Sequence, residues 1–329
     1  MRAARVMRKT IMKTNSSNDM DSATSNSFNN VVAHLAGDKP LRHTELVVLS
    51  NLTSAELAAF KQTWTNVSVE RRRDIVTRLV ELAEDNPELT FNYIFRALLK
   101  DEDAEVRETA IEGLWEDDDT SLIGTFIRMM GQDTSEEVQA AAAAALGKFA
   151  LLTECGKLRD VYTGSISQAL LTVVNNKARP LEVRRRALES VSAFSLPAVE
   201  EAIKAAYVSG NHDYKMSALF AMGRHCDTAF LPILTVELSS DDAETRYEAA
   251  SALGEMGEEG AVSHLIELLD DRDSDVQMAV IRSLGEIGGP QAKKVLKKCL
   301  ASPIEAVAEM AEDALEELNG GENPLDFRF

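Results

Sequence analysis

The residues that could perform chemistry in this sequence are few. His225 and Cys226 form the only adjacent pair of soft metal ligands, and the segment DDRDSD at 270–275 has the alternating carboxylates of a calcium loop. An EF-hand loop would need glycine at its sixth position and glutamate at its twelfth, where Val276 and Arg282 stand. We therefore expect the aspartates to cap a helix and His225 to be a partly buried structural residue.

Motifs of nucleotide binding and of hydrolysis are absent from the sequence. It contains no G-x-S-x-G, G-x-x-x-x-G-K-[ST], H-E-x-x-H or G-x-G-x-x-G. Two Gly-x-x-Gly segments, at 254–257 and 285–288, lack the flanking strands or basic surroundings of a phosphate or RNA loop. Gly257 and Gly288 follow the last apolar residue of a helical stripe, which predicts left-handed glycines that end helices. We expect no catalytic residue, no cofactor and no metal.

Charge and composition limit the partners of this 329-residue chain. Its net charge is −19, and residues 241–329 carry 21 acidic and 8 basic side chains. Nucleic acid is therefore an improbable partner, and a basic or apolar segment of another protein is the expected one. No apolar stretch is long enough to span a bilayer. Three widely spaced cysteines predict neither a disulfide framework nor a zinc ribbon, which fits a reducing cytoplasm.

A repeat accounts for most of the chain. In each copy of the repeat, apolar or small residues stand four and eight residues after the first residue of the copy, which we call its start. This is the spacing of one stripe along an α-helix. Second amphipathic segments, such as 228–238 and 290–300, complete each repeat as a helical hairpin. Intervals of 31 to 45 residues separate successive starts at Arg71, Val106, Val138, Val183, Tyr214, Thr245, Val276 and Val307. The pattern predicts an all-α solenoid of about eight helical hairpins.

Three segments carry a family resemblance. DAEVRETAIEGLW at 103–115, DAETRYEAASALGEMG at 242–257 and DSDVQMAVIRSLGEIGG at 273–289 resemble HEAT repeats, and are most similar to the PBS lyase HEAT-like repeat class. The resemblance implies a right-handed superhelix whose V-R-x-x-A helices line the concave side, where partners usually bind. Gln277 stands where other copies have arginine, so we expect any aspartate-arginine ladder to be interrupted there.

The same resemblance raises the question of an enzyme. The HEAT-like group includes deoxyhypusine hydroxylase, for which the family implies paired His-Glu dipeptides that hold a di-iron centre. None of the five histidines, at 34, 43, 212, 225 and 264, is followed by glutamate. We therefore expect a non-catalytic interaction scaffold or adaptor that binds its partner through the concave groove. The alternative is an enzyme similar to phycobilin or chromophore lyases, or an enzyme accessory subunit.

The chain divides into four predicted parts. Residues 1–38 are expected to be a disordered leader, either a targeting peptide or an over-long start, and 39–66 a helical N-terminal cap with a capping box at Thr53. Residues 67–319 form the solenoid and 320–329 a tail. We expect a monomer.

One strip of side chains is the predicted partner site. Positions two and six after each repeat start point away from the core columns and should face the concave side. Near the middle of the array these positions are apolar, with flanking arginines, and such residue types are enriched at interfaces. The alternative is that these side chains pack between adjacent helices. The strip comprises Met216, Phe220, Tyr247 and Met278 with Arg185 and Arg282, and Trp115 could extend it.

Overall fold

The computed structural model describes residues 27–37, 39 and 41–322, and in these ranges it is all helix and connecting turn. The fold is a HEAT-like α-solenoid, as the repeat predicts. The chain separates into two compact units, Met1–Asp119 and Thr120–Phe329. In the described ranges, no helix has both the length and the apolar character needed to cross a membrane.

The first unit holds the predicted cap and the first repeats. Thr53 forms the expected capping box: its hydroxyl accepts from the Glu56 N–H at 3.3 Å, and its own N–H donates to Glu56 Oε2 at 2.9 Å. After a helical segment at 27–35, the elements are α2 (His43–Leu46), η1 (Val47–Leu49), α3 (Ser54–Trp64), α4 (Val69–Asp85), α5 (Asn92–Leu98) and α6 (Ala104–Glu112).

The segment 27–35 corrects the prediction of a disordered leader that extends to residue 38. Its apolar residues follow the helical spacing i, i+3, i+4 and i+7, so they form one stripe along a helix. The prediction missed this stripe because it considered the polar composition of the segment and not the spacing of its apolar residues. The Arg71 side chain donates hydrogen bonds to the carbonyl oxygens of His34 and Leu35. The buried side chains of this stripe are Phe28, Val31, Val32 and Leu35. Residues 1–26 lie outside the described part of the chain.

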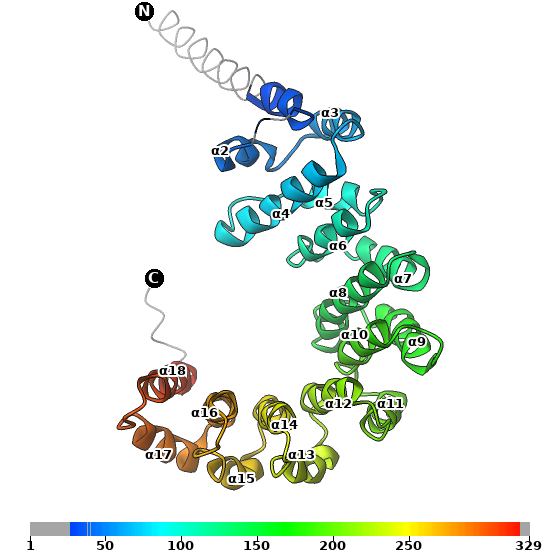
Figure 1. Cartoon of the computed structure of the whole chain (residues 1–329). Helices are drawn as coiled ribbons and strands as arrows, with labels where there is room; N and C mark the ends of the chain where they lie inside the picture. The colour runs from blue at the N-terminus through cyan, green and yellow to red at the C-terminus, as the bar shows by residue number, and fades with distance from the viewer. Residues whose placement is uncertain (1–26, 38, 40, 323–329) are drawn as a thin grey trace, which may run out of the picture. The chain divides into compact units, whose positions relative to one another are not determined.

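The second unit has two layers of helices (Figure 1). Each inner helix packs against the next inner helix, and the outer helices cover their backs. The inner layer comprises α8 (Glu136–Glu154), α10 (Leu181–Val191), α12 (His212–His225), α14 (Ala243–Met256), α16 (Ser274–Ile287) and α18 (Glu305–Glu322). The outer layer comprises α7 (Ser121–Gln132), α9 (Val161–Asn175), α11 (Pro197–Tyr207), η2 (Thr228–Phe230) with α13 (Leu231–Glu237), η3 (Glu259–Ala261) with α15 (Val262–Ile266), and α17 (Gly289–Cys299).

The predicted repeat register agrees with these helices. Each of the eight predicted starts lies near the beginning of one helix of the series α4, α6, α8, α10, α12, α14, α16 and α18. The 45-residue interval lengthens α8 and α9 instead of adding a long loop. The predicted tail starts inside α18, which continues to Glu322.

The glycines of the two Gly-x-x-Gly segments have the predicted structural roles. Gly257 and Gly288 both have φ of 72°, a region that favours glycine, and each ends an inner helix. Gly254 allows close packing of α14 against α16, because a Cβ there would lie 2.6 Å from the Ser283 hydroxyl oxygen. The two segments are helix ends, as predicted, and Gly254 also lies at a contact between helices.

A polar contact recurs at the residue that directly follows the repeat start. Arg107 Nη1 donates to the Asp101 carbonyl oxygen at 2.9 Å, and Arg246 Nη1 donates to the Ser240 carbonyl oxygen at 2.9 Å. Gln277 Nε2 makes the equivalent bond to the Asp271 carbonyl oxygen at 2.6 Å. Gln277 thus keeps this carbonyl contact, because an amide donor serves as well as a guanidinium, but it cannot form an ion pair such as that of Arg246 with Asp271.

Two aspartates of the segment 270–275, Asp271 and Asp273, have structural roles, and Asp273 caps a helix as predicted. Asp273 is the N-cap of α16 and accepts from the N–H groups of Asp275 and Val276 at 3.0 and 3.3 Å. Asp271 forms a buried ion pair with Arg246, with an Nη2–Oδ1 distance of 2.7 Å. The carboxylates are used for capping and inter-repeat pairing.

Candidate metal centre and concave groove

His225 is held in place at the C-terminal end of α12. Its Nδ1 lies 3.1 Å from the Ser192 carbonyl oxygen, and its ring packs edge-on against Phe230 with the centroids 6.0 Å apart. Because a carbonyl oxygen can only accept, Nδ1 must carry the hydrogen in this contact. Nε2 is then the nitrogen that can coordinate a metal, and such outer hydrogen bonds are typical of metal-binding histidines.

Two carboxylates converge with this histidine. Glu200 extends from α11, and Asp227 is the N-cap of η2, where it accepts from the Ala229 N–H at 2.8 Å. One possible ligand atom from each of Glu200, His225 and Asp227 lies within 4.8 Å of the other two. An imidazole nitrogen with two carboxylate oxygens is a donor set for a divalent iron, manganese or zinc ion. Three protein ligands would leave coordination positions open for a substrate.

A second group of possible ligands lies at the other end of α12. His212, Asp242 and Glu244 are all exposed, and their ligand atoms also lie within 4.8 Å of one another. The Glu244 carboxylate, 2.9 Å from His212 Nε2, raises the pKa of His212, so the ring favours the protonated form that cannot coordinate. Asp242 caps α14 and accepts from Thr245, which lowers its pKa. This group is better explained as surface pairing.

The two groups do not make one dinuclear centre. His212 and His225 are 13 residues apart in one helix, which places them about 20 Å from each other at the helical rise of about 1.5 Å per residue. The described residues therefore do not fit the di-iron centre that the family resemblance implies. The donor set of Glu200, His225 and Asp227 fits a single ion.

Two adjacent cavities open along the inner helices α12, α14 and α16. The first, of about 440 Å³, is lined by Phe220, Glu248, Arg282 and Glu286 among others. The second, of about 460 Å³, includes Tyr247, Met278 and Arg282 in its lining. We call the two cavities together the concave groove. Four of the residues predicted for the partner strip, Phe220, Tyr247, Met278 and Arg282, line this groove.

Met216 belongs to the predicted strip, but the prediction that its side chain is exposed is wrong. Its side chain is 4% exposed, and the Thr245 hydroxyl of α14 lies 3.9 Å from its sulfur. Adjacent inner helices approach so closely here that position two of this repeat is covered, which is the packing alternative stated for the strip. Phe220, at position six of the same repeat, is 37% exposed.

Arg185 and Trp115 are not part of the groove lining. Arg185 donates to the Ser217 hydroxyl at 3.0 Å and pairs with Glu182 at 2.9 Å, so its guanidinium is engaged within the inner layer. Trp115 is 69% exposed but belongs to the first unit. Their roles in partner binding remain predictions.

Glu248 has the most perturbed carboxyl of the groove. Burial and the nearby carboxylates of Glu189 and Glu244 raise its pKa to about 7, although Arg185 partly offsets them. Burial also raises the pKa of Glu286. Sequence reasoning missed both residues, as it missed Glu200 and Asp227, because a glutamate on a repeat helix has no local feature that distinguishes it from a solvated one.

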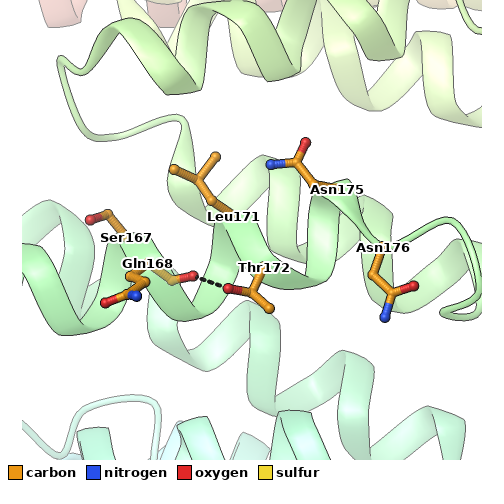
Figure 2. A pocket seen from close by; sticks show the side chains of 6 residues that line it. All are labelled: Ser167, Gln168, Leu171, Thr172, Asn175 and Asn176. Carbon is orange, nitrogen blue, oxygen red and sulfur yellow. Dashed lines mark hydrogen bonds between the residues drawn. The ribbon is translucent and has the colours of Figure 1, made fainter.

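A third hollow lies on the outer helix α9 (Figure 2). Thr172 donates its hydroxyl hydrogen to the Gln168 carbonyl oxygen at 2.7 Å, as Figure 2 shows. Nothing that lines it titrates near neutral pH, so it has no acid-base or metal chemistry. The lining residues are Ser167, Gln168, Leu171, Thr172, Asn175 and Asn176.

Comparisons with known proteins support the fold and find partial matches to hydroxylases. The HEAT-repeat profile matches residues 93–165 and 231–316. Deoxyhypusine hydroxylase of Chaetomium globosum is 31% identical over 176 residues, 47% of this chain and 50% of the relative. The Danio rerio enzyme is 34% identical over 92 residues, 26% of this chain and 30% of the relative. The chain thus spans half or less of the length of these relatives.

A solved structure supports the fold alone. Kap95 in the Kap95:Nup1 complex is 13% identical, with a TM-score of 0.51 over 89% of this chain and 46% of that one. At this identity the likeness says nothing about activity.

The comparisons correct the prediction of a non-catalytic scaffold. The curated relatives are hydroxylases, so the absence of His-Glu dipeptides led the sequence argument away from the enzymes that the chain resembles. Possible ligands can also come from separate helices, and Glu200, His225 and Asp227 are such a group. The matched repeats and the stacked helical hairpins show that the chain has a HEAT-like α-solenoid fold.

Proposed function

We propose that this chain is a metal-dependent enzyme, distantly related to the deoxyhypusine hydroxylases, with one divalent ion held by Glu200, His225 and Asp227. The convergence of these three ligand atoms within 4.8 Å carries the proposal. The hydroxylase relatives support a redox-active metal such as iron, with hydroxylation as the class of reaction. When bound, such an ion supplies Lewis acidity and open coordination positions.

The chain's own residues prepare this site in three ways. The Ser192 carbonyl oxygen orients the His225 ring. The Ala229 N–H fixes one oxygen of Asp227 and leaves the other oxygen for a ligand. Lys204 lies 3.4 Å from the Glu200 carboxylate and partly balances the two negative charges, so the site can form before a cation binds.

Metal binding tests the proposal directly. We expect calorimetric titration of the metal-free protein with Fe²⁺ or Mn²⁺, without oxygen, to show one ion per chain. His225→Ala and Glu200→Gln should each weaken binding at least tenfold, since three protein ligands leave no spare donor. The matched control is His212→Ala, which removes the histidine of the exposed group on the same helix and should leave the affinity unchanged.

Two results would contradict the proposal. One is equal binding by the His225→Ala variant and the unchanged protein, with melting temperatures that show both to be folded. The other is a loss caused by His212→Ala alone, which would move the site to the opposite end of α12.

A chromophore-lyase function is the second candidate, and its support is the resemblance of residues 242–257 and 273–289 to the PBS lyase class of repeats. Co-expression with a bilin and a phycobiliprotein subunit tests it, since a lyase would yield a coloured subunit with the bilin covalently attached. A colourless subunit would reject this candidate and leave the metal centre unaffected.

A further inference from the structure

The concave groove is strongly acidic. Six carboxylates line its two cavities, and Arg282 is the one cationic side chain among the lining residues. The carboxylates are Glu248, Glu255 and Glu286 in the first cavity and Glu244, Asp273 and Asp275 in the second. A groove of one sign of charge attracts ligands of the opposite sign.

Part of this charge already has a partner within the chain. Glu255 pairs with Arg224 at 3.0 Å, and Glu244 lies 2.9 Å from His212. Asp273 caps α16. In the described part of the chain, Glu248 and Glu286 make no hydrogen bond or ion pair through their carboxyl groups. The first cavity therefore offers two acidic groups, one on α14 and one on α16, that are available to a ligand.

Apolar side chains adjoin these carboxyl groups. Phe220 of α12 lines the first cavity and is 37% exposed, while Tyr247 and Met278 line the second and are partly buried. Aromatic and methionine side chains at a rim of charged groups are typical of protein interfaces. The groove thus combines apolar contact area with two carboxyl groups that make no hydrogen bond or ion pair in the described part of the chain.

We propose that the concave groove binds a basic amphipathic segment of a partner protein. Lysine side chains of the segment pair with Glu248 and Glu286, and its apolar side chains pack against Phe220 and Met278. Lysine suits this groove because its aliphatic stem covers apolar surface while its ammonium group reaches a carboxylate. Charge complementarity selects this occupant over an acidic or a purely apolar one.

The charges around Glu248 give this binding a pH dependence. Glu189 and Arg185 on α10 and Glu244 on α14 act on its carboxyl, and together with burial they hold its pKa near 7. At pH 6 the group carries a proton that it must lose to pair with an ammonium, so the segment should bind more weakly at pH 6 than at pH 8. His212, beside Glu244, becomes more positively charged at lower pH and then repels a cationic ligand, which also weakens binding at pH 6.

Peptide binding to the full chain tests the inference. The probe is a fluorescein-labelled 14-residue peptide of leucine and lysine, its acidic counterpart has glutamate for lysine, and both are measured by anisotropy with EDTA present. EDTA makes the result independent of the metal centre. We expect the basic peptide to bind, the acidic one not to bind, and Glu248→Gln to weaken binding at least fivefold at pH 8.

The control variant is Glu267→Gln, which removes the same charge from an exposed position just after the outer helix α15 and should leave the affinity unchanged. Phe220→Ser tests the apolar contact without a change of charge and should also weaken binding. Equal losses in Glu248→Gln and Glu267→Gln would show general electrostatic attraction and would overturn the inference. The alternative occupant is the chain's own N-terminal segment. A peptide of residues 1–13 of this chain that binds more tightly than the probe, in a manner that depends on Glu248, would overturn the assignment to a partner protein.

Discussion

At the scale of single residues, Glu248 shows what stacking of repeats does to an ordinary side chain. In one helix it would be a solvated carboxylate, but burial in the stacked helices and the carboxylates of Glu189 on α10 and Glu244 on α14 raise its pKa to about 7. The folded state therefore holds a proton that the unfolded chain releases at lower pH. Ionisation of Glu248 therefore lowers the stability of the folded state.

This cost predicts the pH dependence of stability. Because the folded pKa lies above the ordinary value of 4.5, the contribution of Glu248 to the free energy of unfolding falls as pH rises from about 4.5 to about 7. Glu248→Gln removes the ionisation and should stabilise the protein by about 1 to 3 kcal/mol at pH 8, but not at pH 4.5. Urea unfolding at both pH values measures this, with Glu267→Gln as control. An equal effect at both pH values would mean that the carboxyl is not perturbed.

At the scale of elements, close contact between inner helices depends on small residues. A Cβ at Gly223 of α12 would lie 2.6 Å from the Cα of Ala252 in α14, a distance at which backbone must move. Gly124 of α7 has nothing within 4 Å of a Cβ built on it. The same residue type thus serves helix packing at one position and has no contact role at the other.

The two glycines form a matched pair of variants. Gly223→Ala should destabilise the protein by about 1 to 3 kcal/mol, because overpacking pushes α12 away from α14. Gly124→Ala should stabilise it by up to about 1 kcal/mol, since alanine favours an exposed helix. Denaturant midpoints of the two variants measure the difference. A neutral Gly223→Ala would show that the helices separate without cost.

At the scale of the whole molecule, each repeat of the second unit covers the apolar face of the one before it. The last inner helix, α18, packs against both α16 and α17. Ile281, Leu284 and Leu296 beneath it are fully buried. In a linear array the final repeat thus separates the core from water.

Truncation after Ser302 tests this role of α18. The shortened chain exposes Ile281, Leu284 and Leu296, so we expect it to aggregate at concentrations where the full chain remains dispersed. Light scattering of both chains against concentration is the measurement. Substitution of Glu312, an exposed residue of α18, by glutamine is the control and should have no effect. A truncated chain with unchanged melting temperature and scattering would contradict the repeat assignment.

The sequence alone determined the features that depend on neighbours along the chain. Helix ends at Gly257 and Gly288, the cap at Asp273 and the stripe at positions four and eight follow from local hydrogen bonding and from the helical period. These regularities, repeated eight times, made the all-α solenoid predictable. The stripe of residues 27–35 was equally local, and the prediction failed there because composition was weighed above spacing.

Only the tertiary structure decided which residues meet across helices. Glu200 is 25 residues from His225 in the sequence, and no spacing rule joins a residue of α11 to the end of α12 and the start of η2. Met216 and Phe220 had the same predicted orientation, yet the close approach of α14 covers one and leaves the other in the groove. Burial and electrostatics depend on the distances between packed helices, and the repeat pattern specifies that helices pack without specifying those distances.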